Sequence, residues 1–168
     1  MSPDVKSNLA RIKNTSQEIN AMATKATALI KSLDEALGRA GVGYAVDGPR
    51  INSSTGENKN GDLVDIFRDL HYGRVDDGWC LFVEETAEVT DDEGEKVKDS
   101  DNEVEIEIVG RTALAKASRE LRLAAMPVIP AFIEKIANEL ETNAKRLETS
   151  IQATEAVFGE LEEALGDK

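Results

Sequence analysis

The chain has 168 residues, of which 32% are charged and only 4% are aromatic, and its formal net charge is −13. The only cysteine, Cys80, excludes an intramolecular disulfide, and no apolar run approaches the roughly 18 residues of a membrane span. The acid excess argues against direct nucleic-acid binding, because phosphate contacts need clusters of Lys and Arg. These features predict a cytoplasmic protein without a membrane segment, folded as a single domain over residues 1–168.

The first segment, residues 1–40, has the pattern of one long helix. Apolar or small side chains recur from Val5 to Leu37 in alternating steps of four and three residues. This is the a/d seam of a coiled coil. No Pro or Gly interrupts the seam, and Gly38 follows it, where a glycine can cap the end of a helix.

The middle of the chain, residues 41–110, is predicted to hold a loop and an acidic β module. After a short possible strand at residues 44–46, a polar and turn-rich run at residues 52–61 predicts a connection. Apolar residues between Leu63 and Leu70 recur at helical spacing. This stretch is therefore predicted as a short amphipathic helix, with an edge strand as the alternative.

Two β signals follow. An Asp-Asp-Gly sequence at residues 76–78 stands between apolar segments and indicates a hairpin turn. The run Trp79–Val83 is apolar on both faces, which predicts a central strand. Residues 103–108 then alternate strictly between Glu and Val or Ile, as expected of a half-buried antiparallel strand with one carboxylate face.

Nearly all of the net charge lies in this module. Residues 76–107 contain fourteen acids and two lysines, a net of −12. Charge confined in this way indicates electrostatics directed at a partner, for which a basic protein is a natural choice. The predicted partner surface consists of nine acidic residues: Asp91, Asp92, Glu93, Glu95, Asp99, Asp101, Glu103, Glu105 and Glu107.

The last third, residues 111–168, is predicted to be helical and begins with a basic stretch at residues 111–122. On a helix, three arginines of this stretch would share one side. They could pair with the acidic strand or with acids of the terminal helix, form an anion site for a phosphate or nucleotide, or contact a partner protein. The candidate anion-binding residues are Arg111, Lys116, Arg119 and Arg122.

A second heptad-like stretch covers residues 129–165 and matches the first in length. Since each apolar seam must be buried, the predicted fold class is α+β. Two long heptad-patterned helices would pack as an antiparallel coiled-coil hairpin, with a shorter helix and a small antiparallel β-sheet. In layout, the heptad stretches at 5–37 and 129–165 around a β segment resemble prefoldin subunits. That resemblance implies coiled-coil arms and β-mediated oligomerisation.

The sequence predicts no catalytic residues, metal site or cofactor. Asp99, Asp101 and Glu103 are spaced like the start of a calcium loop, but Val104 replaces the required glycine. His71 and Cys80 could meet across the hairpin as a nucleophilic pair, although a Cys in an apolar strand is usually a small buried residue.

The predicted function is that of a non-enzymatic interaction or assembly protein. It would form homo-oligomers through its long helices and present the acidic β module to a partner protein. One alternative is an acidic nucleic-acid mimic that inhibits a DNA-binding protein. Another is a module that binds a small anionic ligand, such as a nucleotide, through residues 111–122.

Overall fold

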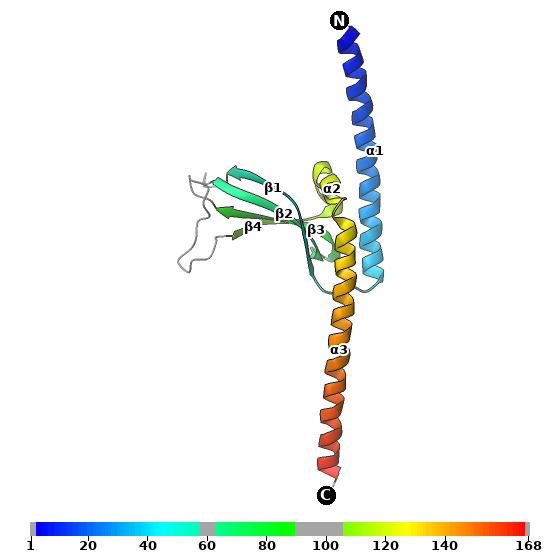
Figure 1. The fold of residues 1–168 in the computed structure, drawn as a ribbon, viewed down its shortest axis with the longest axis vertical. Coiled ribbons are helices and arrows are strands. Elements are labelled where there is room, and N and C mark those ends of the chain that lie inside the picture. The colour runs from blue at the N-terminus through cyan, green and yellow to red at the C-terminus, as the bar shows by residue number, and fades with distance from the viewer. Residues whose placement is uncertain (1–2, 58–62, 90–105, 167–168) are drawn as a thin grey trace. The chain divides into compact units, whose positions relative to one another are not determined.

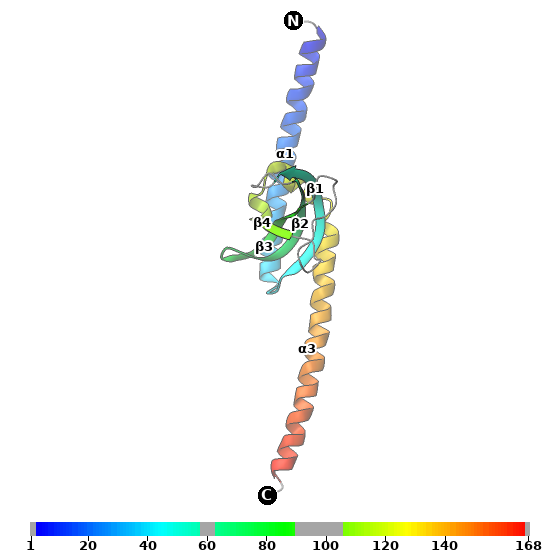
Figure 2. The same cartoon turned by 90° about the vertical axis from the view of Figure 1, so that its left-hand side faces the viewer.

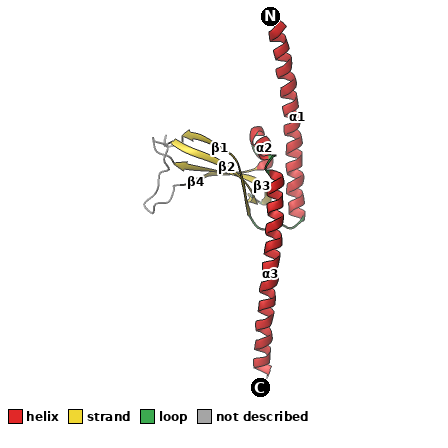
Figure 3. Cartoon of the chain, in the orientation of Figure 1, coloured by secondary structure: helices red, strands yellow, loops and turns green. Residues whose placement is uncertain are grey.

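The computed structural model describes residues 3–57, 63–89 and 106–166. The chain forms two compact units, Met1–Pro130 and Ala131–Lys168. Its elements are three helices, one 3-10 turn and four strands within the described ranges (Figures 1 and 3). In chain order they are α1 (Pro3–Arg39), β1 (Val46–Glu57), β2 (Leu63–Val75), β3 (Gly78–Val89), β4 (Ile106–Ala113), η1 (Leu114–Lys116), α2 (Arg119–Ala125) and α3 (Ile129–Gly166). The α+β class is confirmed.

The four strands form one antiparallel sheet in the order β1-β2-β3-β4. β2 and β3 make the predicted hairpin, with Val75 opposite Gly78 and Asp76 at a φ of 53° in the turn. A short polar residue such as Asp tolerates this left-handed backbone better than most others. The position of β3 inside the sheet confirms the prediction of a central strand.

The prediction of a helix between Leu63 and Leu70 is wrong, because β2 begins at Leu63 and lies in the middle of the sheet. Its apolar residues fit both periods. In the strand, Ile66 and Leu70 face one side of the sheet while Leu63 and Phe67 face the other. Pairing with β1 and β3 decides between these possibilities, and such long-range pairing has no local signal.

β1 occupies most of the stretch that was predicted as a loop. Its residues are polar and mostly exposed, and its backbone pairs with β2 along nearly the whole strand. Pro49 lies where the register shifts, between Asp47 and Arg50. Because proline donates no hydrogen bond, a shift on an edge strand is one of the few places in a sheet that accept it.

The core of the first unit lies where α1 contacts β3, η1 and α2 (Figures 1 and 2). Ala23, Ala26 and Ile30 of α1 are buried there. Tyr72 of β2 is also fully buried, and its hydroxyl donates to the carbonyl of Val42 at 3.1 Å. The small residues in the middle of the α1 seam therefore let this helix pack closely against β3, η1 and α2.

Asp34 of α1 accepts a backbone hydrogen bond at the beginning of β3. β4 pairs with β3 only from Phe82 to Glu88, so the beginning of β3 has no β4 partner. The N–H of buried Leu81 instead donates to Asp34 Oδ1 at 2.7 Å. Burial raises the pKa of the Asp34 carboxyl, and this hydrogen bond acts in the opposite direction.

The predicted antiparallel hairpin of two long helices is wrong. Such a hairpin would bury both seams along their length, yet the first part of the α1 seam and the second part of α3 are exposed. Val5, Leu9 and Ile12 are 44–62% exposed, and Leu147, Ile151, Val157 and Phe158 are 50–64% exposed. Periodicity shows which face of a helix is apolar but not what covers it, and the middle of the α1 seam packs within the first unit.

The predicted helix over residues 111–122 is divided among three elements. Arg111 belongs to β4, Lys116 ends η1, and α2 begins at Arg119. Ala117 is extended, with ψ at 169°, which interrupts any continuous helix. Ser118 then caps α2 by accepting a hydrogen bond from the N–H of Leu121 at 3.2 Å.

Candidate functional site

The predicted acidic partner surface lies mostly outside the described residues. Only Glu107, on β4, can be placed. The other eight, Asp91, Asp92, Glu93, Glu95, Asp99, Asp101, Glu103 and Glu105, fall in the undescribed range 90–105. The carboxylate spacing that a nucleic-acid mimic requires lies mainly in the same range, so that alternative stays a prediction.

Glu107 lines a pocket of about 240 Å³ on one face of the sheet. The sheet register creates it, because Ile66, Ala87 and Glu107 are neighbours across β2, β3 and β4. Three carboxylates border it and four aliphatic side chains complete its lining. The complete set is Glu57, Glu85, Glu107, Val64, Ile66, Ala87 and Val109.

The charge of this pocket is partly balanced internally. Glu85 forms an ion pair with Arg68 at 2.5 Å. Among the described residues, Glu57 and Glu107 make no such pair. Carboxylates beside an aliphatic surface suit an alkyl chain that ends in an ammonium group, as in a lysine side chain. No group of His, Cys, Asp or Glu in the described part of the chain could hold a metal ion.

The opposite face of the sheet carries arginines over aromatic rings. The guanidinium of Arg50 lies 3.8 Å from the centroid of the Phe67 ring, and its Nε is 3.0 Å from Asp69. Arg111 lies 5.8 Å from the Phe82 centroid and forms an ion pair with Glu84 at 2.5 Å. The Arg111 guanidinium thus contacts side chains of β3.

The structure therefore does not bring the four predicted anion-binding residues together. Arg119 and Arg122 share a groove between α1 and α2, whereas Arg111 lies on the sheet. Lys116 lies near Cys80, where its positive charge only partly offsets the rise in the thiol pKa that burial causes. Sequence reasoning missed Lys31, which lines the same groove from α1, because 88 positions separate it from Arg119.

The β2–β3 hairpin does not make Cys80 an activated nucleophile. Burial, followed by the charge of Asp34, raises the pKa of the Cys80 thiol, whereas a reactive cysteine needs a lowered pKa. His71 stacks on Phe82, with centroids 5.3 Å apart, and its Nδ1 lies 3.1 Å from Asp47 Oδ1.

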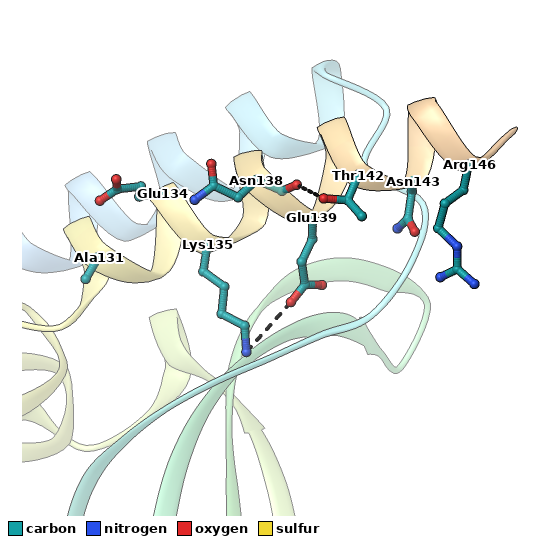
Figure 4. A pocket seen from close by; sticks show the side chains of 8 residues that line it. All are labelled: Ala131, Glu134, Lys135, Asn138, Glu139, Thr142, Asn143 and Arg146. Atoms are coloured by element: carbon teal, nitrogen blue, oxygen red, sulfur yellow. Dashed lines mark hydrogen bonds and ion pairs between the residues drawn. The ribbon is translucent and has the colours of Figure 1, made fainter. Parts of the chain in front are cut away.

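A polar hollow runs along one side of α3 (Figure 4). Lys135 Nζ lies 3.7 Å from Glu139 Oε1, and the Thr142 hydroxyl donates to the carbonyl of Asn138 at 2.8 Å. These contacts join residues four apart on one solvated helix, which is ordinary helix-surface chemistry. The hollow therefore presents no catalytic grouping.

Comparisons with protein-family models, curated proteins and solved structures yielded no match to this chain. Within the described ranges, none of the helices combines the length and apolar character required to cross a membrane.

Proposed function

We propose that this is a non-enzymatic interaction and assembly protein of the cytoplasm. It forms oligomers through its long helices and presents its acidic β module to a basic partner. The observation that carries the proposal is the exposure of apolar seams on α1 and α3. Val5, Leu9 and Ile12 follow the heptad spacing on α1, and Leu147, Ile151 and Phe158 continue it on α3. The single free cysteine is compatible with a reducing compartment.

A second copy of the chain is the favoured occupant of these seams, because their charges are complementary. The first part of α1, residues 3–16, carries a net charge of +2 in the sequence. Residues 147–166 contain five acids and no base. Contact between α1 of one copy and α3 of another therefore brings opposite charges together, whereas α1–α1 or α3–α3 contacts join like charges.

The free energy gained by burying the exposed seam residues can be estimated from their exposure. A fully buried Leu or Ile contributes about 1.5–3 kcal/mol, and these side chains are already about half covered. Each would add about 1 kcal/mol in an α1–α3 contact between copies. Association also costs several kcal/mol in lost translational and rotational freedom. Assembly should therefore depend on protein concentration and weaken when a single seam residue is replaced.

Light scattering after size-exclusion chromatography tests the assembly. Ile12→Asp and Ile151→Asp place a charge in each seam. Asn14→Asp and Gln152→Asp add the same charge to exposed positions outside the seams. Dissociation by the two seam variants alone supports the proposal, whereas equal masses for all four variants would reject it.

The acidic module is tested with a defined basic probe. A lysine-rich peptide should bind the wild type more weakly as salt rises, because the attraction is screened. Glu57→Gln with Glu107→Gln should lower its affinity, since both residues line the sheet pocket. Glu141→Gln with Glu148→Gln removes the same charge from α3 and serves as the control. Equal affinity for both double variants would exclude the pocket as the contact.

A further inference from the structure

The groove between α1 and α2 has no role in the proposed assembly. It has a volume of about 630 Å³ and is contained in the first unit. α1 supplies a row of polar side chains one helical turn apart, and α2 supplies two arginines. The polar and charged residues that line the groove are Asn20, Thr24, Thr27, Lys31, Arg119 and Arg122.

Positive charge dominates the groove. Lys31, Arg119 and Arg122 contribute three cations, and no acidic residue lines it. Arg119 forms an ion pair with Glu120, whose Oε1 lies 3.1 Å from Arg119 Nη2. One carboxylate cannot neutralise three cations, so the groove favours an anion.

The two arginines are held in place by the scaffold. Arg119 Nη1 donates to Asn20 Oδ1 at 2.8 Å, which ties α2 to α1. Arg122 Nη1 donates to the carbonyl of Ala117. The Nε of Arg122 is buried and has no hydrogen-bond partner among the described residues. Guanidinium groups that are already positioned lose little freedom when they bind a ligand, and their planar shape suits phosphate oxygens.

The remaining lining residues indicate a ligand larger than a bare ion. The hydroxyls of Thr24 and Thr27 donate to α1 carbonyls, at 3.0 Å to Asn20 and 2.9 Å to Ala23. Their oxygens can accept hydrogen bonds from a ligand hydroxyl or amino group. The volume is also within the range of small-molecule sites.

We propose that this groove binds a small organic phosphate monoester. Its phosphate contacts Arg119, Arg122 and Lys31, and its hydroxyl or amino groups face the threonines. Lys31 is exposed and reaches the groove from α1, so it is the cation whose removal disturbs the scaffold least. The competing explanation is that the arginines only brace α2 against α1.

Titration calorimetry distinguishes these explanations, with inorganic phosphate, glucose 6-phosphate and adenosine monophosphate as probes. The wild type should bind at least one monoester more tightly than inorganic phosphate. Lys31→Gln should weaken that binding about tenfold, because it removes one charge-assisted contact. Lys25→Gln removes an equivalent charge from α1 outside the groove and should leave the affinity unchanged.

Arg122→Gln is the second variant, with its fold checked by circular dichroism. If Arg122→Gln does not fold, the comparison of monoester affinity between Lys31→Gln and Lys25→Gln is sufficient to test the proposal. The proposal is overturned if no monoester binds at millimolar concentration, if inorganic phosphate binds as tightly as the monoesters, or if Lys31→Gln and Lys25→Gln have the same effect. Assembly through the helix seams does not enter this test, so either proposal can fail independently.

Discussion

Replacing Asp34 with Ala should destabilise the first unit, because it removes the hydrogen-bond acceptor at the beginning of β3. The N–H of Leu81 donates to Asp34 Oδ1 at 2.7 Å, and Leu81 is fully buried. β4 pairs with β3 only from Phe82 onwards, so no strand carbonyl can replace the carboxylate. The variant would leave a buried N–H without a partner.

The magnitude follows from two opposing effects. Leaving a buried backbone donor without its acceptor costs about 1–3 kcal/mol. The carboxylate itself is destabilised by partial desolvation, since burial raises its pKa, and removing it returns part of this cost. We therefore expect Asp34→Ala to lower the free energy of unfolding by about 1–2 kcal/mol. Asp34→Asn keeps an oxygen acceptor and should cost less.

Urea unfolding followed by tryptophan fluorescence measures this loss. The only tryptophan, Trp79, lies two residues before Leu81 and stacks on Tyr72 with ring centroids 5.8 Å apart. Its emission therefore reports on the relevant end of β3. An Ala variant as stable as the wild type, or an Asn variant as unstable as the Ala variant, would refute the assigned role of Asp34.

Three further predictions concern the same unit. Because burial raises the Asp34 pKa above its ordinary 3.8, the folded protein binds this proton more tightly than the unfolded chain. The stability that the wild type gains from this proton, relative to Asp34→Asn, should be largest below about pH 4 and should disappear as pH rises through the raised pKa. Urea titrations of both proteins at several pH values measure this difference. Gly73→Ala should cost about 1–3 kcal/mol in thermal or urea unfolding, since a Cβ there would lie 3.1 Å from buried Phe82; Gly78→Ala, with nothing within 4 Å, is the control. Cys80 should react with iodoacetamide more slowly in the folded protein than in urea at neutral pH, because its thiol pKa is raised; equal rates would contradict this assignment.

Elements with a strong local period were predictable from the sequence. The heptad pattern predicted residues 5–37 and 129–165, and the helices observed are α1 (Pro3–Arg39) and α3 (Ile129–Gly166). The Asp-Asp-Gly turn similarly predicted the β2–β3 hairpin. In each case the decisive residues are neighbours in the sequence, so their spacing carries the information.

Features that depend on distant residues were not predictable in this way. β1 is polar and is held by pairing with β2, and the alternation of β2 was hidden by apolar residues on both faces. The Asp34–Leu81 hydrogen bond joins residues 47 positions apart. At the basic groove, Arg119 and Arg122 were recognised as candidates, but Lys31 was not. No local pattern links these partners.

In the proposed function, the exposed helix seams join copies of the chain. The most direct test is the molar mass of the purified protein, measured by light scattering over a micromolar concentration series. We expect the wild type to have a mass above the 18.2 kDa of one chain, and we expect this mass to fall towards 18.2 kDa on dilution or in Ile151→Asp. A constant 18.2 kDa for the wild type throughout the series would contradict it.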